Sequence, residues 1–347
     1  MKSVPLLFFE SRKVLHMLLI YNDSTNPAYN LAMEEYLLTR KREDVVMLWR
    51  NDNAVIIGRN QNAVEELNLE FIQERKVTVI RRLTGGGAVF HDLGNINFTF
   101  IEANRADSFN NYARFTRPIC DYLNTLGVDA QLSGRNDLTV DGMKISGNAQ
   151  TVKNGRIMHH GTLLFSANMS DLAGALKPRA IKIESKGIKS IRSRVTNISA
   201  HLAAPMTVLE FLEGLKQYFL DTVPGINEYL LTPEDKAAVD KLVEEKYGRW
   251  EWNYGQSPRY GFEKAKKFPA GLVEAKLEVE NGVVKATKIL GDFFGVNEVE
   301  RLEQCLAGVR HTSEDIRKVL EPVDTQSFIY GVDKEDLAKL LSPEAEE

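Results

Sequence analysis

Residues 81–95 read RRLTGGGAVFHDLGN, and this stretch decides how the rest of the chain is interpreted. It places three consecutive glycines, at 85–87, inside a region rich in strand-forming residues. Glycine loses more conformational entropy on folding than any other residue, so such a run needs a reason. One reason is an anion site, because glycine N–H groups can approach phosphate or carboxylate oxygens and Arg81 and Arg82 can add charge-assisted hydrogen bonds. A tight turn between two strands, with solvated arginines, is the alternative of equal weight.

The residues around the glycine run exclude two common nucleotide-binding motifs. No Gly-Lys-Ser or Gly-Lys-Thr follows it, so it is not a Walker A phosphate loop. It also lacks the GxGxxG spacing and the following helix of a dinucleotide-binding turn. An anion site at this bend would therefore be of another kind.

A second polar segment, SGRNDLTVDGMKISGNAQ, covers residues 133–150. Lys144 stands in a short strand pattern bounded by glycines, where a lysine can hold a phosphate oxygen and a carbonyl oxygen together. Asp137 can ligate a Mg²⁺ ion that bridges phosphates. On spacing alone, a solvent-exposed strand lysine is the more common outcome.

A histidine pair, His159 and His160, opens the apolar stretch HHGTLLF at 159–165. Neighbouring strand residues face opposite sides of a sheet, so at most one of the two points into a given pocket. A hydrogen-bonded sheet histidine is a better interpretation than a general base.

Composition and charge limit the classes of function. The 347 residues carry a formal net charge of -4 with a pI near 6.0, which gives no basic field for nucleic acid. The two cysteines, Cys120 and Cys305, lie far apart and form no metal-binding cluster, so we expect a reducing, cytoplasmic compartment. The apolar stretch at 4–9 is too short to span a membrane. We expect residues 1–16 to be a leader or an upstream start.

The order of predicted elements is mixed rather than a regular alternation, which favours an α+β fold with a largely antiparallel or mixed β-sheet and flanking helices. A helix is expected from Asn26-Pro27, and the polar cluster at 51–53 suggests a hairpin between strands 45–49 and 54–57. A change in residue composition after residue 246, where an aromatic segment begins, divides the chain into 1–246 and a smaller unit at 247–347. The smaller unit contains a hairpin turn at Asn281-Gly282. The other expected helices are 64–74, 109–126, 232–247, 298–306 and 313–320. The other expected strands are 18–21, 77–81, 88–90, 97–101, 137–140, 144–146, 158–165, 271–279 and 283–290.

Taken together, these segments resemble the lipoate–protein ligase family from about Leu18 onward. The resemblance is carried by RRLTGGGAVFHDLGN, SGRND, KISGNAQ and HHGTLLF in that order, and by the later RSRVTNIS, EWNYGQSP and GDFFG. It implies a biotin-ligase-like catalytic domain, distantly similar to class II aminoacyl-tRNA synthetases, with a small α+β C-terminal accessory domain.

The resemblance also implies roles for individual residues. Arg82 corresponds to an arginine that binds nucleotide phosphate and lipoyl carbonyl, and Lys144 to the active-site lysine that contacts the acyl-phosphate and the lipoyl end. Asp137 is the expected magnesium ligand. The adenylate-binding backbone segment would be Gly87, Ala88, Val89 and Phe90. The lipoate-binding residues would be Trp49, Arg82, Thr84, Gly85, Gly86, Gly87, Lys144 and His160.

The implied activity uses ATP and Mg²⁺ to convert lipoate or octanoate into an acyl-adenylate, and then transfers the acyl group to a lysine of a lipoyl carrier domain. The carrier would be a glycine-cleavage H protein or a 2-oxoacid dehydrogenase E2 subunit. We expect a monomer with no bound prosthetic group, no nucleic-acid partner and no membrane. The alternatives are a cysteine-dependent octanoyl or lipoyl transferase without ATP, a biotin–protein ligase, and a non-catalytic nucleotide- or lipoyl-domain-binding module.

Overall fold

The structure of the protein is a computed structural model that describes residues 17–61, 63–176, 195–254, 261–280 and 283–342. The expected leader at 1–16, the turn at Asn281-Gly282, and parts of RSRVTNIS and EWNYGQSP lie outside the described residues. Within the described residues, no helix is long and apolar enough to cross a bilayer.

The larger, N-terminal part of the chain is built on an eight-stranded mixed sheet in the order β11-β1-β2-β6-β10-β9-β8-β7. β1 runs parallel to both of its neighbours in the sheet, β11 and β2. All the other neighbouring strands of this sheet are antiparallel to each other. The strands are β1 (Met17–Tyr21), β2 (Asp44–Trp49), β6 (Asn95–Ala103), β7 (Gln131–Ser133), β8 (Asp137–Val140), β9 (Met143–Lys153), β10 (Arg156–Leu164) and β11 (Ile226–Glu228).

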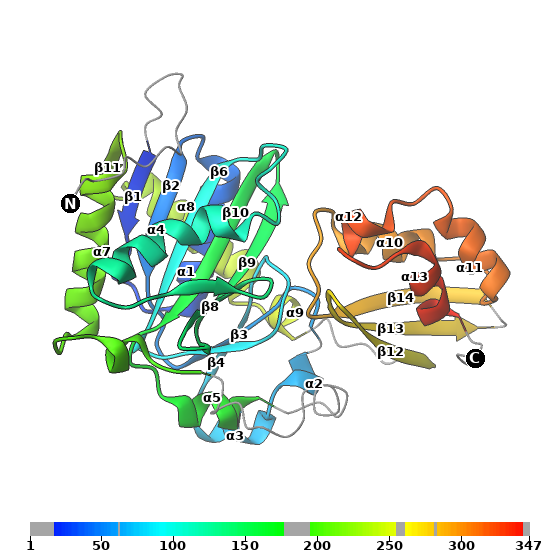
Figure 1. The fold of residues 1–347 in the computed structure, drawn as a ribbon. Coiled ribbons are helices and arrows are strands. Elements are labelled where there is room, and N and C mark those ends of the chain that lie inside the picture. Colours follow the sequence, from blue (N-terminus) through cyan, green and yellow to red (C-terminus); the bar gives the residue numbers. More distant parts are fainter. Residues whose placement is uncertain (1–16, 62, 177–194, 255–260, 281–282, 343–347) are drawn as a thin grey trace.

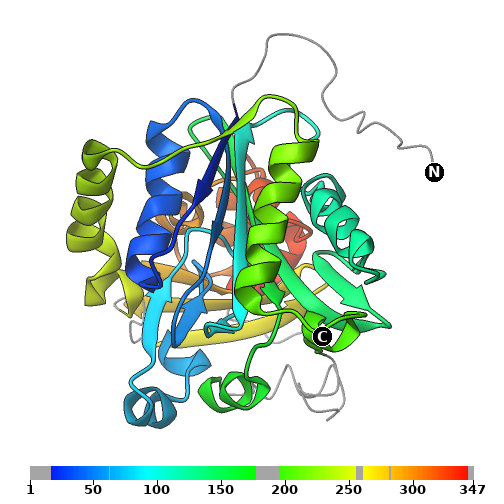
Figure 2. The same cartoon turned by 90° about the vertical axis from the view of Figure 1, so that its left-hand side faces the viewer.

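Helices cover both faces of this sheet (Figures 1 and 2). α1 (Pro27–Arg40) and α8 (Pro233–Leu242) pack on one face, and α4 (Tyr112–Thr125) and α7 (Val208–Thr222) pack on the other. The sequence sets where α1 begins, since the Asn26 side chain accepts hydrogen bonds from two first-turn N–H groups and Pro27 occupies the first turn. The sheet is therefore buried on both sides, between two separate apolar clusters.

A second, three-stranded sheet lies beside the α1 face and has the order β4-β3-β5. β3 (Ala54–Ile57) is parallel to β4 (Thr78–Arg81) and antiparallel to β5 (Val89–His91). The glycine run at 85–87 connects β4 to β5. The remaining short helices of this part are α2 (Ala63–Glu66), α3 (Leu69–Glu74), α5 (Met169–Ala175), η2 (Ile198–His201), η3 (Val243–Tyr247) and α9 (Trp250–Asn253).

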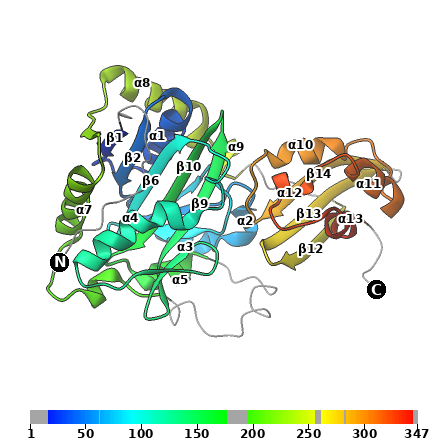
Figure 3. The ribbon, with the colours of Figure 1, turned by 45° about the horizontal axis from the view of Figure 1, so that its top comes forward.

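The C-terminal part has its own apolar cluster around an antiparallel sheet in the order β12-β13-β14. Its helices gather on one face of that sheet, and the whole unit lies on the opposite side of the larger part from α7 (Figures 1 and 3). Its elements are β12 (Phe262–Phe268), β13 (Gly271–Glu280), β14 (Val283–Gly291), α10 (Val299–Cys305), α11 (Ser313–Leu320), α12 (Thr325–Phe328) and α13 (Lys334–Leu341).

The α+β prediction is confirmed, and two local predictions are wrong. The helix expected at 64–74 is divided into α2 and α3. β2 and β3 do not form a hairpin, because β2 pairs with β1 and β6 in the large sheet while β3 pairs with β4 and β5 in the small one. Both edges of each strand are already occupied by other partners. The polar residues at 51–53 thus carry the chain from one sheet to the other. The division after residue 246 stays a prediction, and Trp252 still packs with the α1-side cluster of the larger part.

Candidate active site

A cavity of about 150 Å³ lies between the α1 face of the large sheet and the small sheet. Polar side chains from β5, β6, β9 and β10 line part of it, together with Arg82 just after β4. Apolar side chains from α1, β2 and β3 line another part. Phe294, from the C-terminal part, also contributes to its wall. The predicted site residues that line this cavity are Trp49, Arg82, Gly86, Gly87, Ala88, Val89, Lys144 and His160.

Arg82 is held in the cavity wall by a buried chain of hydrogen bonds. Its Nε donates to Thr84 Oγ1 at 2.9 Å, and Thr84 Oγ1 lies 2.8 Å from His160 Nε2. On the other side of the imidazole, His160 Nδ1 lies 2.8 Å from Glu34 Oε1. Burial lowers the pKa of Arg82 to about 10, so the guanidinium stays cationic at neutral pH. α1 and β10 thus fix the orientation of an arginine that comes from β4 and its following turn.

The glycine bend also contacts the Arg82 guanidinium directly. Arg82 donates to the carbonyls of Gly85 at 2.7 Å and of Gly87 at 2.8 Å. Gly86 adopts φ +92, a conformation that side-chain-bearing residues rarely adopt. The bend therefore wraps its carbonyl groups around the cation.

Arg81 has a different role from its neighbour, and the prediction that it binds an anion is wrong. Its side chain is fully buried, and its guanidinium donates to backbone carbonyls on two segments. One segment is the turn after β3, where Gly58 and Gln61 accept. The other is α9, where the carbonyls of Trp252 and Asn253 accept at 3.0 and 3.1 Å. Arg81 ties the chain leading to the C-terminal part onto the small sheet.

Lys144 lies near the start of β9 and forms an ion pair with Asp137 of β8, with 2.8 Å between Nζ and Oδ1. Both side chains are partly exposed, at 36% and 37%. No group of three or more His, Cys, Asp or Glu side chains within the described residues could hold a metal by itself. Mg²⁺ commonly binds one or two carboxylates together with substrate phosphates, so a single Asp137 beside the cavity fits that donor set.

The C-terminal part packs directly onto the glycine bend. Gly86 N–H donates to the Phe293 carbonyl at 3.3 Å, and a Cβ on Gly85 would lie 2.0 Å from the same oxygen. Glycine is therefore required at 85 for this close approach. Phe294 lines the cavity, and the Arg135 guanidinium stacks 4.3 Å from the centre of its ring.

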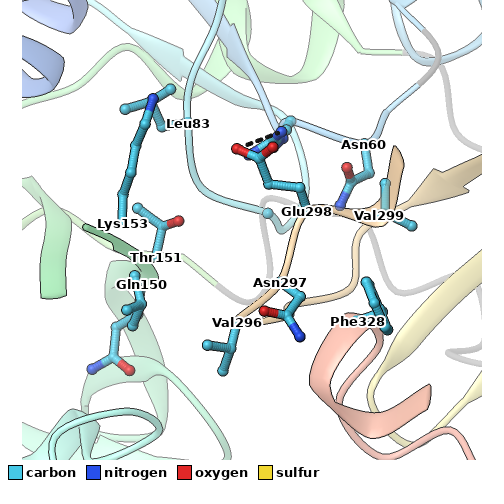
Figure 4. Close-up of a pocket in the computed structure, with 14 residues that line it drawn as sticks. Asn60, Leu83, Gln150, Thr151, Lys153, Val296, Asn297, Glu298, Val299 and Phe328 are labelled. Carbon is cyan, nitrogen blue, oxygen red and sulfur yellow. Dashed lines mark ion pairs between the residues drawn. The ribbon is translucent and has the colours of Figure 1, made fainter. Parts of the chain in front are cut away.

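A smaller cavity, of about 30 Å³, lies where the two parts meet. Figure 4 shows Gln150, Thr151 and Lys153 of β9 on one side, with Val296 and neighbouring residues opposite. An ion pair crosses this junction, with 3.7 Å between Arg59 Nη2 and Glu298 Oε1.

Four predicted site residues do not line the main cavity. Thr84 is buried between Arg82 and His160, and Gly85 lines the smaller cavity at the junction. The Phe90 side chain packs in a separate apolar cluster with side chains of β3 and β4. Asp137 reaches the cavity through its ion pair with Lys144.

Neither cysteine fits a nucleophile of this cavity. Cys120 lies on α4 and packs against the apolar cluster on the face of the large sheet away from the cavity. Burial raises its pKa to about 11. Cys305 is exposed on α10 of the C-terminal part. A thiol with a raised pKa is a poor nucleophile, so the geometry disfavours the thiol-transfer alternative.

Sequence reasoning missed several residues of the cavity wall. Phe294 lies about two hundred positions after the glycine bend, in the GDFFG segment, for which the resemblance implies no site role. Asn97, Asn148 and His91 also line the cavity. His91 lies inside the RRLTGGGAVFHDLGN stretch and on the same face of β5 as Val89, which is the signal that could have identified it.

These features define a class of enzyme domain in which one cavity joins two cationic side chains and a glycine bend to an apolar pocket, as an acyl-activating enzyme requires. Comparison with known proteins agrees. Residues 26–220 match the family model of the lipoyl protein ligase A/B catalytic domain, and residues 257–341 match that of the bacterial lipoate protein ligase C-terminus. The chain belongs to the lipoate–protein ligase family, and it is a ligase.

Individual relatives cover nearly the whole chain. The lipoate-protein ligase LplJ of Bacillus subtilis is 44% identical over 330 residues, which is 94% of this chain and 100% of the relative. Plasmodium falciparum LipL1, solved in complex with lipoate, has a TM-score of 0.75 at 29% identity and covers 89% of this chain and 95% of its own.

Two further solved structures each cover about 70% of the chain. A lipoate-protein ligase A bound with ATP has a TM-score of 0.59 at 26% identity, covering 69% of this chain and 98% of its own. A bi-partite ligase from Thermoplasma acidophilum, described with its E2 lipoyl domain, has a TM-score of 0.63 at 28% identity, covering 71% of this chain and 98% of its own.

Proposed function

We propose that this ligase activates lipoate with ATP to lipoyl-AMP and then transfers the lipoyl group to a lysine of a lipoyl carrier domain. The observation that carries the proposal is a single cavity lined by Arg82, Lys144 and the glycine bend that also contains the apolar side chains of Leu31 and Trp49. An acyl chain can lie in the apolar region while its carboxylate meets the cations.

The first half-reaction requires neutralisation of charge more than an acid or a base. A carboxylate oxygen of lipoate attacks the α-phosphorus of ATP, the bond to the β-phosphate oxygen breaks, and pyrophosphate leaves. Negative charge accumulates on the oxygens around the α-phosphorus and on the departing pyrophosphate, and Arg82, which follows β4, and Lys144 of β9 stabilise it. The buried chain from Thr84 to Glu34 keeps Arg82 from turning away.

The glycine bend provides the adenylate-binding segment, through the backbone of residues 87–90. In the structure the carbonyls of Gly85 and Gly87 accept hydrogen bonds from Arg82. An incoming phosphate or carboxylate competes for the same guanidinium hydrogens, and it is the stronger acceptor because it is charged. Glycine lets the bend move aside at low steric cost, which explains why flexible residues occur next to the arginine.

Magnesium would be held by Asp137 together with phosphate oxygens of the nucleotide. When bound, the ion neutralises charge on the departing pyrophosphate. Lys144 now pairs with Asp137, so we propose that nucleotide binding separates this pair and turns the ammonium toward the acyl-phosphate.

In the second half-reaction the ε-amine of the carrier lysine attacks the anhydride carbonyl and AMP leaves. The apolar cavity wall and Phe294 keep water from the intermediate until then. We propose a glycine-cleavage H protein or a 2-oxoacid dehydrogenase E2 subunit as the carrier. We also propose a cytoplasmic monomer, in keeping with two free cysteines.

The test is pyrophosphate release by the full chain with ATP and one acid at a time: lipoate, octanoate or biotin. We expect release with lipoate that depends on Mg²⁺, and no release with biotin. Transfer is then followed by the mass gain of an apo H protein or an E2 lipoyl domain. Release with biotin alone, or acyl transfer to the carrier without ATP, would contradict the proposal.

A further inference from the structure

His91 has a buried ring N–H that finds no hydrogen-bond partner among the described residues. A chain of side-chain amides shows which ring nitrogen carries this hydrogen. Asn30 Nδ2 donates to the backbone carbonyls of Ser24 and Arg50 at 2.9 and 2.8 Å. Carbonyl oxygens only accept, so this end of the Asn30 amide must be the nitrogen. The same nitrogen lies 2.9 Å from the side-chain amide of Asn51. The Asn51 atom that faces it is the oxygen Oδ1, because an amide nitrogen cannot accept a hydrogen bond.

The orientation of Asn51 then sets the tautomer of His91. With its oxygen facing Asn30, Asn51 turns its Nδ2 toward His91 Nδ1, at 3.1 Å, and donates to it. Burial and the nearby cation of Arg82 lower the pKa of His91 to about 3, so the ring is neutral. A neutral ring whose Nδ1 accepts must carry its proton on Nε2.

This Nε2–H is buried and has no hydrogen-bond partner among the described residues. His91 is only 3% exposed and lines the main cavity. Asn97 is 2% exposed, lines the same cavity, and its Nδ2 also lacks a partner among those residues. A buried donor left unpaired is unfavourable, so an acceptor is expected in the cavity when it is filled.

The strand register separates Lys144 from Trp49, the residue whose ring His91 contacts. The Lys144 Nζ lies against Gly147 of β9, whose N–H donates to Thr162 of β10. Thr162 is opposite Asn97 of β6, and Asn97 is opposite Trp49 of β2. The backbones of Gly147 and Trp49 are thus three strand spacings apart, or about 14 Å.

His91 lies at the Trp49 end of this row, with their ring centroids 6.4 Å apart. An acyl chain whose carboxylate meets Lys144 and whose body crosses the sheet would bring its distal end to His91. Lipoate and octanoate share the same length of carbon chain and differ at that distal end, where lipoate carries a five-membered disulfide ring. Sulfur is a weak hydrogen-bond acceptor and an alkyl terminus is none.

We propose that His91 determines acyl specificity: its Nε2–H donates to a ring sulfur of the bound substrate, so that the enzyme prefers an acid bearing a cyclic disulfide to an unsubstituted fatty acid of the same chain length. This inference rests on the proposed function, because it takes the cavity as the acyl site. No covalent or redox step is involved.

Calorimetric titration of the full chain without ATP tests the inference. The ligands are lipoate, octanoate and 5-cyclopentylpentanoate, which has the same ring size without sulfur. We expect the wild-type protein to bind lipoate about threefold to tenfold more tightly than the cyclopentyl acid, the range for one weak hydrogen bond. His91→Phe keeps an aromatic ring but no donor, so it should abolish that preference while leaving the affinity for the cyclopentyl acid within about twofold.

Two further variants control for shape and folding. Ile56→Val removes one methylene from the same cavity wall and should change the affinities for lipoate and the cyclopentyl acid by equal factors. His91→Gln keeps an amide donor and should retain part of the preference, which also covers the case in which His91→Phe does not fold.

The outcomes separate this inference from the proposed function. Equal weakening of both ring-bearing acids in His91→Phe, or an unchanged preference for lipoate, overturns the role of His91 even if the wild-type protein releases pyrophosphate. Wild-type protein that binds lipoate but releases no pyrophosphate with ATP overturns the proposed function and leaves the role of His91 to be decided by the titrations. No binding of lipoate overturns both.

Discussion

Replacing Lys144 by alanine should separate activity from stability more cleanly than any other change in this chain. The side chain is 36% exposed, and its ion-pair partner Asp137 is 37% exposed. Ion pairs at such exposure contribute about 0–1 kcal/mol to the free energy of unfolding. For a chain of this size, a loss of that order lowers the melting temperature by less than about 4 °C.

The effect on the chemical step should be much larger. Lys144 and Arg82 line one cavity, and in the proposed mechanism both stabilise the charge that develops around the α-phosphate. Removing one such electrostatic contact lowers the rate about a hundredfold to a thousandfold. Lys144→Arg should also fail, because a planar guanidinium cannot replace a compact ammonium in a narrow site. Single-turnover pyrophosphate release with ATP and lipoate measures the rate, and thermal melting measures the fold.

Lys153→Ala is the matched control. Lys153 lies on the same strand, its side chain is also 36% exposed, and it too forms one ion pair with a carboxylate, that of Glu35. It does not line the main cavity, so its loss should leave pyrophosphate release within about twofold of wild type. A folded Lys144→Ala protein that releases pyrophosphate at the wild-type rate would refute the assignment, as would an equal loss of rate in Lys153→Ala.

Three other changes test separate parts of the structure. Thr84→Val leaves the Arg82 Nε–H without its buried acceptor, and we expect a loss of about 1–3 kcal/mol in urea unfolding together with slower adenylation; an unchanged unfolding midpoint would contradict this. The double variant Cys120→Ser and Cys305→Ser should retain ATP-dependent transfer to a lipoyl domain, and its complete loss in a folded protein would revive the thiol route. Burial alone would raise the pKa of Glu35, but two neighbouring lysines lower it overall. The ionised Glu35 therefore stabilises the fold at neutral pH, and this stabilisation is lost on acidification through the lowered pKa. The difference in unfolding free energy between wild type and Glu35→Gln should shrink below about pH 4, and a difference that grows there would contradict this sign.

The sequence by itself determined the parts that depend on local chemistry. Asn26-Pro27 starts α1 because capping and a fixed proline φ act within one turn. The glycine run and Lys144 could be assigned to one family because their order along the chain is specific, and the comparisons confirm that family. The α+β class followed from the mixture of periodicities, which is also a local property.

Only the tertiary structure decided how identical or neighbouring residues differ. Arg81 and Arg82 are adjacent and chemically the same, yet one is buried against α9 and the other lines the cavity, because strand alternation turns them to opposite sides. In the same way, the sequence predicts a hairpin of β2 and β3, but in the structure each strand pairs with other strands. The position of Phe294 in the cavity wall likewise depends on contacts between distant segments. So does the His91 Nε2–H, which has no hydrogen-bond partner in the described part of the chain. Such contacts are set by packing across the whole fold, and no short stretch of sequence encodes them.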